Sequence, residues 1–284
     1  MIFWIASYPK SGNTWIRTLI SSYYYTEDGI FKESKIHNID QFPQKKYFKD
    51  FKYDKTIVND TARLWLKAQK KINLDKKLRF FKTHNAFGNL NGNPFTDNTN
   101  SIGAIYVVRD PRNVITSLKN HYELNDNQAY SWMINENNYL YDTHNFKEDG
   151  YSDFQFISSW STNYKSWKVQ KKIPIKIIKY EDLLKETYLI FKDLINFINM
   201  LVNNSEYINR DKLKKVIDST LFDKLRKEEQ DKGFTESVLS RDGKRKIPFF
   251  NLGPKNDWNK ILNIKMVKKI EEVFAESMKD LSYK

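Results

Sequence analysis

A short stretch near the N-terminus, residues 8–15 (YPKSGNTW), is rich in groups that bind anions. It follows an apolar run and leads into an apolar helical pattern, which predicts a strand, a loop and the N-terminus of a helix. Backbone N–H groups there, with the hydroxyls of Ser11 and Thr14, would hold a phosphate-like anion, and Gly12 would allow its close approach. In the ATP-binding loop G-x-x-x-x-G-K-[ST] the lysine follows the glycine, whereas Lys10 precedes Gly12 here, so a different anion is indicated.

A histidine follows a second apolar run. His84 comes just after Leu78–Lys82, where a neutral imidazole could take a proton from an attacking hydroxyl or amine. A purely structural role for His84 is the alternative that its position alone leaves open. His37, His121 and His144 have no comparable placement, and we expect them to be structural or exposed.

An arginine ends a third apolar run, Gly103–Val108. A guanidinium at a strand end fits bidentate binding of a phosphate, although Arg109 could instead pair with Asp110 at the surface or belong to a helix cap. Asp110 can cap the helix that follows, with Pro111 at its first position. Ser117 lies in that helix, eight residues after Arg109.

The apolar runs and the helical patterns between them predict an α/β fold. Four short runs rich in Ile, Val, Phe or Tyr are typical of buried strands, namely Ile2–Ser7, Leu78–Lys82, Gly103–Val108 and Pro174–Lys179. Helices alternate with them, and two later ones are expected at Leu184–Met200 and Met266–Met278. This alternation predicts a parallel sheet covered by helices on both faces.

Ligands of such sheets bind beyond the carboxyl ends of the strands. We therefore expect four loops to converge on one site, at Tyr8–Thr14, Thr83-His84, Arg109–Arg112 and Tyr180-Glu181. We treat residues 1–284 as one domain, in which 26–76 and 121–165 are long, largely helical insertions that could form a lid or a pocket wall. The second insertion holds a cluster of aromatic residues that could line a pocket or pack in the core: Tyr122, Tyr130, Trp132, Tyr139, Tyr141, Phe154 and Phe156.

The composition restricts partners and location. The formal net charge of +13 favours anionic ligands, although lysines that simply solvate the surface explain much of it. The sequence has no nucleic-acid recognition motif, no cysteine, no basic leader before the first apolar run and no apolar run of the ~20 residues that a membrane span needs. We expect a cytoplasmic protein with no nucleic-acid or membrane partner, and the sequence predicts no oligomeric state.

Together these motifs resemble the PAPS-dependent sulfotransferase family, whose donor is 3′-phosphoadenosine 5′-phosphosulfate (PAPS). Residues 8–15 resemble the family's 5′-phosphosulfate loop, PKSGTTW, and Arg109 with Ser117 matches the spacing of its 3′-phosphate motif. Further similarities extend the resemblance over about residues 2 to 260: Lys82-Thr83-His84, Ser159-Trp160 with Trp167, Tyr180-Glu181-Asp182, Thr220-Leu221-Phe222, and Gly253 with Asp257-Trp258. The resemblance implies a P-loop NTPase-like, three-layer α/β/α fold.

The resemblance also implies a role for each matching residue. The 5′-phosphosulfate would be held by Lys10, Ser11, Gly12, Asn13 and Thr14, and the 3′-phosphate by Arg109 and Ser117. The adenosine would contact Trp15, Tyr180, Thr220 and Phe222, and Gly253 would belong to the same donor site. His84 would deprotonate a small-molecule or carbohydrate acceptor, and Lys10 would stabilise the leaving phosphate. No metal ion is expected, because a sulfuryl group carries only one negative charge.

The sequence departs from the family pattern and leaves two other functions open. Asn251-Leu252 replaces an Arg-Lys pair before Gly253, Asn256 replaces a second glycine, and no proline closely follows the KTH segment. The missing charge could come from one of three nearby basic residues, Arg245, Lys246 or Lys255. The alternatives are a P-loop-type small-molecule kinase, with Asp110 as the strand-end magnesium ligand, and a non-catalytic nucleotide- or polyanion-binding protein.

Overall fold

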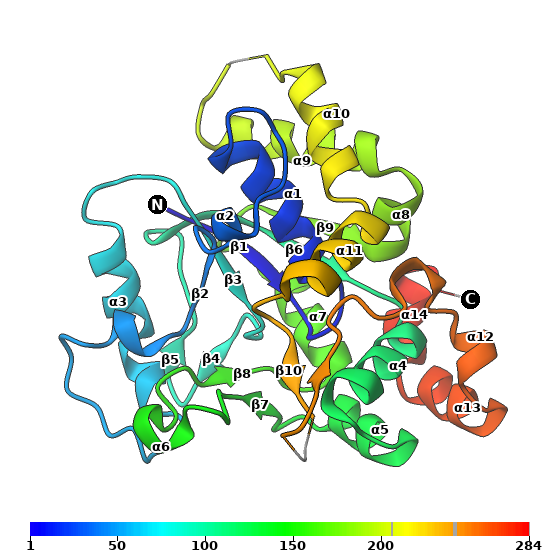
Figure 1. Ribbon diagram of the computed structural model, residues 1–284. Helices are drawn as coiled ribbons and strands as arrows, with labels where there is room; N and C mark the ends of the chain where they lie inside the picture. Colours follow the sequence, from blue (N-terminus) through cyan, green and yellow to red (C-terminus); the bar gives the residue numbers. More distant parts are fainter. Residues whose placement is uncertain (206, 241–242, 284) are drawn as a thin grey trace.

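A parallel five-stranded sheet lies between two layers of helices in the computed structural model, which describes residues 1–205, 207–240 and 243–283 (Figure 1). The strand order is β2 (Asp40–Gln41), β3 (Arg79–Thr83), β1 (Ile2–Ser7), β6 (Ser101–Val108) and β9 (Ile175–Lys179), and all pairs are parallel. The four longer strands confirm the sequence prediction to within two residues at each end. The edge strand β2 was missed because two polar residues carry no apolar pattern.

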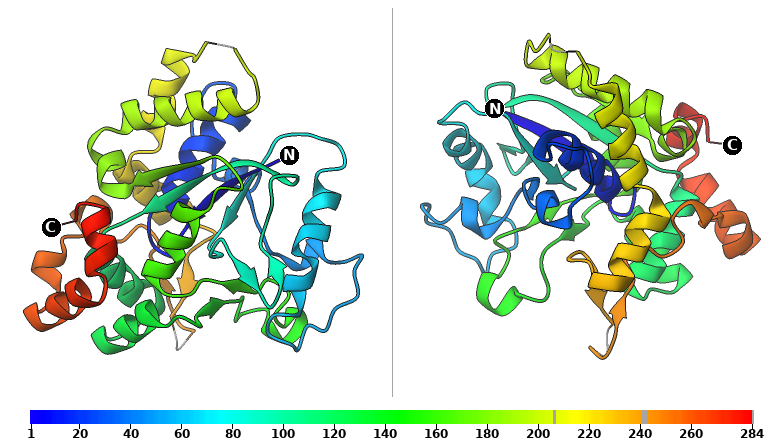
Figure 2. Two further views of the ribbon diagram at one scale, coloured as in Figure 1. Left: turned by 180° about the vertical axis from the view of Figure 1, so that it is seen from behind. Right: turned by 45° about the horizontal axis from the view of Figure 1, so that its top comes forward.

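The central strands are buried on both faces because their side chains alternate between two cores. Phe3 and Ile5 face one core, while Trp4 and Ala6 face the other. The first core is closed by four helices: α1 (Asn13–Tyr25), α8 (Tyr180–Lys185), α9 (Thr187–Leu201) and α10 (Arg210–Ser219). The second is closed by six: α3 (Trp65–Ile72), α4 (Pro111–Tyr122), α5 (Asp126–Ile134), α7 (Trp160–Val169), α13 (Ile264–Val273) and α14 (Ala275–Asp280). Figure 2 shows both layers from behind.

Two predicted helices are interrupted. The helix expected at Leu184–Met200 is α9, and it is separated from the short α8 at Glu186, whose φ of −128° is outside the helical region. The helix expected at Met266–Met278 is divided into α13 and α14 at Phe274. The Phe274 ring is buried against Trp160, at 5.0 Å between ring centroids, so tertiary packing overrides the helical pattern there.

The two insertions are less helical than the sequence predicts. Residues 26–76 contain α2 (Glu33–Ile36), the edge strand, α3 and two 3₁₀ turns, Lys45–Tyr47 and Asp60–Leu64. Residues 121–165 contain α5, α6 (Phe146–Asp149) and a two-stranded antiparallel pair, β7 (Tyr139–Leu140) and β8 (Gln155–Phe156), before α7. Among the described residues no helix is long and apolar enough to span a bilayer.

The segment after α10 runs back over the carboxyl end of the sheet. It comprises α11 (Phe222–Lys232), the antiparallel pair β10 (Val238–Leu239) and β11 (Lys246–Ile247), a 3₁₀ turn at Gly253–Lys255, and α12 (Trp258–Ile261). A small antiparallel pair, β4 (Asn89–Leu90) and β5 (Asn93–Pro94), precedes β6.

Candidate active site

A cavity of about 1130 Å³ lies beyond the carboxyl ends of the central strands. All four predicted loops contribute to its lining, as do the 121–165 insertion and the segment after α10. Most of the predicted site residues line it: Lys10, Gly12, Asn13, Thr14, Trp15, His84, Arg109, Ser117, Tyr180, Phe222 and Gly253. Ser11 and Thr220 are not among the lining residues and are almost completely buried behind it.

The loop between β1 and α1, called here the anion cradle, has the features that an anion-binding loop requires. Gly12 precedes the first turn of α1 with a left-handed φ of 104°, and no side chain caps this helix N-terminus. A Cβ at Gly12 would lie 2.5 Å from Cδ2 of Tyr180, so only glycine allows this ring to pack on the loop. The Oγ of Ser11 is buried and has no hydrogen-bond partner among the described residues. An unpaired buried hydroxyl and a free helix N-terminus are features that a bound anion would satisfy.

We expect Gly12→Ala to weaken binding of 3′,5′-adenosine bisphosphate at least tenfold and to destabilise the fold by about 1–2 kcal/mol, because the new Cβ both meets Tyr180 and strains a positive φ. Gly88→Ala is the matched control, since Gly88 has open space around its Cβ position. Calorimetric titration and thermal unfolding of both variants measure the two effects. Equal binding by both variants would contradict a close approach of the ligand at Gly12.

Two predicted loop side chains already have protein partners. The Asn13 amide donates to the Ile5 carbonyl at 2.9 Å and to Ser7 Oγ at 3.2 Å, which fixes the loop to its strand. The Thr14 hydroxyl donates to the Glu236 carboxylate at 2.6 Å. The groups that this end of α1 offers to a ligand are therefore its backbone N–H groups rather than the Asn13 amide.

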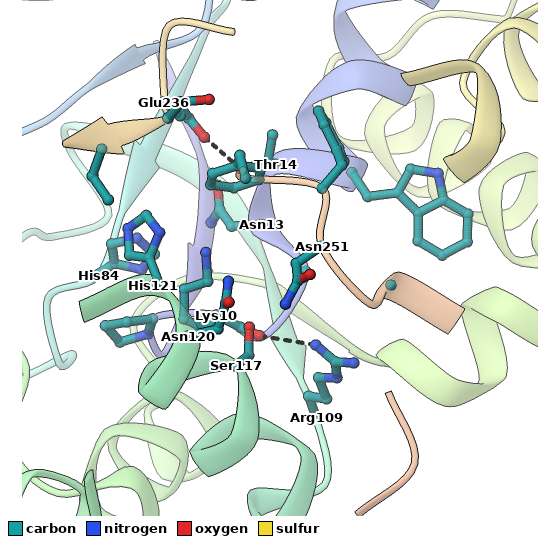
Figure 3. A pocket seen from close by; sticks show the side chains of 18 of the residues that line it. Lys10, Asn13, Thr14, His84, Arg109, Ser117, Asn120, His121, Glu236 and Asn251 are labelled. Atoms are coloured by element: carbon teal, nitrogen blue, oxygen red, sulfur yellow. Dashed lines mark hydrogen bonds between the residues drawn. The ribbon is translucent and has the colours of Figure 1, made fainter. Parts of the chain in front are cut away.

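Glu236 is a residue of the site that sequence reasoning missed. Its carboxylate accepts the hydrogen bond of Thr14 (Figure 3). It also contacts the Arg17 guanidinium, and its Oε1 lies 3.4 Å from Lys82 Nζ. Burial alone would raise the pKa of Glu236, but the two cations and the Thr14 hydroxyl hold it well below its usual range. This carboxylate thus neutralises part of the positive charge at the anion cradle. No sequence signal pointed to it, because the segment that carries it has neither a motif nor a periodic pattern.

Lys10 lines the cavity, and its ammonium lies 4.1 Å from the centroid of the Phe249 ring. Its backbone has a φ of 65°, which turns the side chain over the loop toward the cavity (Figure 3). Burial lowers the pKa of Lys10 to about 7; the Glu236 carboxylate opposes this shift, and the Lys82 and Arg109 cations contribute to it. An anionic ligand would therefore stabilise the charged form of this lysine.

His84 is held in one tautomer by the strand beside it. Its Nδ1 lies 2.7 Å from the Ser7 carbonyl oxygen, which can only accept, so Nδ1 carries the proton and Nε2 is unprotonated. The backbone N–H of His84 donates to Gln155 Oε1 at 2.8 Å. Burial and the nearby Lys82 ammonium lower the pKa of His84 to about 3, so the neutral ring persists across the physiological range. This arrangement can accept a proton at Nε2.

Arg109 lines the cavity and does not form the surface ion pair with Asp110 that its sequence position allowed. Its guanidinium stacks on the Tyr180 ring at 4.3 Å and donates to the Lys10 carbonyl at 3.3 Å, and its buried Nε has no partner among the described residues. Asp110 pairs instead with Arg112 at 2.7 Å and caps α4 by accepting from the Arg112 N–H. The alternative of an Arg109–Asp110 pair is therefore wrong, and Asp110 is not among the residues that line the cavity.

Aromatic side chains form part of the cavity wall next to the anion cradle. Trp15 packs edge-on against Tyr180, at 5.7 Å between centroids, and donates from its indole to the Thr220 carbonyl at 3.2 Å. The Thr220 hydroxyl itself donates back into α10, so this residue positions Trp15 from behind the cavity. Phe222 packs on Gly253, where a Cβ would lie 2.1 Å from the ring. Such flat surfaces suit a purine.

The segment that replaces the family's Arg-Lys pair brings one basic candidate to the cavity. Of the three basic residues considered from the sequence, Lys255 is among the lining residues, whereas Arg245 and Lys246 are not. Arg245 pairs with Glu123 at 3.1 Å. Asn256 accepts from Thr116 at 2.7 Å and donates to the Asn113 carbonyl at 2.9 Å, so it ties this segment to α4.

The insertion at 121–165 supplies the remaining wall. Four of the seven aromatic residues singled out from the sequence line the cavity, namely Tyr122, Trp132, Tyr139 and Tyr141. The other three pack in or against the second core. His121 and His144 also line the cavity, and His144 is exposed, as expected. Sequence spacing could not place them, because neither follows a strand of the sheet.

The sequence of this chain is similar to those of known proteins. The family model described as sulfotransferase domain matches residues 2–282. A luciferin sulfotransferase from Photinus pyralis is 26% identical over 213 residues, which cover 71% of this chain and 52% of that protein, so the chain spans about half the length of this curated relative.

Solved structures share the fold. A mouse sulfotransferase, SULT7A1, complexed with PAP superposes with a TM-score of 0.52 at 16% identity, covering 98% of this chain and 84% of that one. A retinol dehydratase in a complex with retinol and PAP gives a TM-score of 0.58 at 16% identity, covering 98% and 81%. The fold is thus the P-loop NTPase-like α/β fold of these proteins, as predicted.

Proposed function

The chain belongs to the sulfotransferase domain family, and we propose that it transfers the sulfuryl group of PAPS to a hydroxyl or amine of a small-molecule acceptor. The observation that carries this proposal is the meeting of three groups in one cavity. They are the anion cradle at Gly12, the ammonium of Lys10 and the unprotonated Nε2 of His84 (Figure 3).

Each group has a distinct task in this reaction. The bound donor supplies a sulfuryl group whose bond to a phosphate oxygen breaks as its bond to the acceptor oxygen or nitrogen forms. His84 Nε2 takes the proton of the acceptor, while Nδ1 keeps its hydrogen bond to Ser7. The Lys10 ammonium and the N-terminus of α1 stabilise the negative charge on the leaving phosphate oxygen.

The donor fits the groups around the cradle. The buried Ser11 hydroxyl and the helix N-terminus would hold the 5′-phosphosulfate, and the Arg109 guanidinium with the half-buried Ser117 would hold the 3′-phosphate. Trp15, Tyr180 and Phe222 would surround the adenine, and Lys255 would supply one of the two charges that Asn251-Leu252 lacks.

The test is a calorimetric titration of the whole protein with 3′,5′-adenosine bisphosphate, beside ADP and ATP with magnesium. We expect selective binding of the bisphosphate without metal. Transfer of ³⁵S from labelled PAPS to 2-naphthol and to an aryl amine then measures the reaction itself. Selective, magnesium-dependent binding of ATP would overturn the proposal and favour the kinase. Bisphosphate binding without transfer to any of a broad set of alcohols, sugars and amines would favour a non-catalytic binding protein.

We expect Arg109→Ala to weaken binding of 3′,5′-adenosine bisphosphate about 30-fold and binding of 5′-AMP by less than threefold. The reason is that a bidentate pair with a phosphate is worth about 2 kcal/mol, and 5′-AMP lacks the 3′-phosphate. Arg109→Lys, which keeps the charge but loses the planar fork, should be intermediate. Parallel titrations with the two nucleotides measure the ratio, and an equal loss for both would place the 3′-phosphate elsewhere.

Donor affinity should fall as the pH rises from 7 to 9. The pKa of Lys10 is about 7 in the free protein and is raised by a bound anion. Below pH 7 Lys10 is mostly charged before the ligand binds, whereas above pH 7 it is mostly neutral and must take up a proton when the ligand binds. The total fall should be less than tenfold, as for removal of the lysine itself, and the ligand's phosphates are almost fully ionised in this range. Titrations of 3′,5′-adenosine bisphosphate at pH 7, 8 and 9 measure it. Lys10→Arg stays charged and should show a flat profile, whereas the same slope in both would assign it to another group.

A further inference from the structure

His121 is a buried imidazole at the cavity, and one of its ring nitrogens has no hydrogen-bond partner among the described residues. It lies one residue before the end of α4, is 9% exposed and is among the residues that line the cavity. Its Nδ1 is buried and makes no hydrogen bond with any described residue. A buried polar group left unpaired is costly, so such a group in a cavity is a candidate for contact with the ligand.

His121 lies where the reacting groups meet the aromatic wall. Its ring packs edge-on against Tyr122, at 4.6 Å between centroids, and against Phe249, at 5.9 Å. Phe249 is the ring over which the Lys10 ammonium lies, at 4.1 Å. His84 and His121 are close neighbours at one side of the cavity (Figure 3). An acceptor group that contacts His121 would therefore lie next to the hydroxyl that His84 would deprotonate.

The imidazole of His121 acts as a neutral hydrogen-bonding group. Burial, with the positive charges of Lys10 and Lys82, lowers the pKa of His121 to about 3. A neutral ring has one donor and one acceptor nitrogen, so it can either donate a hydrogen bond to a hydroxyl or accept one from it. Proton transfer is left to His84, whose tautomer is fixed by Ser7.

We propose that His121 binds a second hydroxyl of the acceptor, adjacent to the one that is sulfated. This inference rests on the proposed function and deepens it by naming the acceptor class, an aromatic compound with two neighbouring hydroxyl groups. The two imidazoles at one side of the cavity match the two hydroxyls. The rings of Trp132, Tyr139 and Tyr141, which line the same cavity, provide apolar surface for the aromatic body.

The test compares two probes that differ by one hydroxyl, 2,3-dihydroxynaphthalene and 2-naphthol. Each is titrated by calorimetry into the protein saturated with 3′,5′-adenosine bisphosphate, so that no turnover is needed. We expect the native protein to bind the diol about tenfold more tightly, which is the usual worth of one hydrogen bond. His121→Phe should bring this ratio to about one with 2-naphthol affinity nearly unchanged, and His121→Asn, which keeps an amide in place of the ring nitrogens, should restore part of it. His37→Asn, at an exposed position, is the control.

Each outcome decides the matter. A native protein that does not prefer the diol, whether it binds both probes equally or neither, overturns the inference. An equal loss for both probes in His121→Phe would also overturn it, because the ring would then act only in packing. If the bisphosphate itself does not bind, the proposed function fails first, and the two failures are distinguishable.

Discussion

Replacing His84 by Asn is expected to lower kcat for sulfuryl transfer about 10³-fold and to leave binding of 3′,5′-adenosine bisphosphate within twofold of the native value. A positioned general base contributes about 10² to 10⁴ in rate, and the unprotonated Nε2 of His84 is the group that we propose for that task. Asn is the conservative choice, because its amide can still donate to the Ser7 carbonyl and hold the loop.

The pH profile provides a second readout of the same assignment. Burial and Lys82 lower the pKa of His84 to about 3, and a base works in its unprotonated form, so activity should be lost only as the pH falls toward that value. Between pH 5 and 7 the native kcat/KM for the donor should be free of the acidic limb near 6.5 that an ordinary histidine would give. Measuring kcat/KM for the donor over pH 4–8, which reports the protein without bound donor, tests this.

The control for His84→Asn is His37→Asn. His37 is exposed and is not among the residues that line the cavity, so this variant should keep full activity. A decrease in kcat of less than tenfold in His84→Asn would show that His84 is not the general base. A parallel loss of bisphosphate binding would mean that His84 shapes the donor site instead, because the β3 end and the β1 loop are joined through Ser7.

The sequence predicted those parts of the site that follow strands of the sheet. Lys10, His84, Arg109 and Tyr180 each come at or just after the carboxyl end of a parallel strand, and strands of this kind deliver their loops to one edge. Periodicity was sufficient there because a strand buried on both faces is a continuous apolar run. The edge strand β2 was not predicted, because it consists of only two residues and both are polar.

The parts that the sequence did not predict depend on long-range packing. Glu236 reaches Thr14 from more than two hundred residues away, through a segment with no motif. His121 is in the same helix as Ser117, but its ring lies near His84 only because tertiary packing places α4 beside the cavity. The break of the last helix at Phe274 arises from a contact with Trp160 that no local pattern specifies.

Lys10→Ala is expected to lower kcat about 10²- to 10³-fold while weakening bisphosphate binding less than tenfold. The lysine charge matters most where negative charge develops, on the leaving phosphate oxygen, and removing one such group typically costs this much in rate. In the free protein the same charge is costly, since burial, to which the Lys82 and Arg109 cations add, lowers the pKa of Lys10 to about 7. Thermal stability should therefore be unchanged or slightly higher in Lys10→Ala.

Single-turnover transfer of ³⁵S from labelled PAPS, together with calorimetry of 3′,5′-adenosine bisphosphate, separates the two effects for Lys10→Ala. Lys67→Ala removes a lysine from the exposed face of α3 and serves as the control for a general change in net charge. Lys10→Arg should recover binding more fully than rate, because its planar fork places the charge differently from an ammonium. Equal losses in rate and affinity would show that Lys10 binds the donor uniformly, and the stabilisation of the leaving group would then rest on the N-terminus of α1.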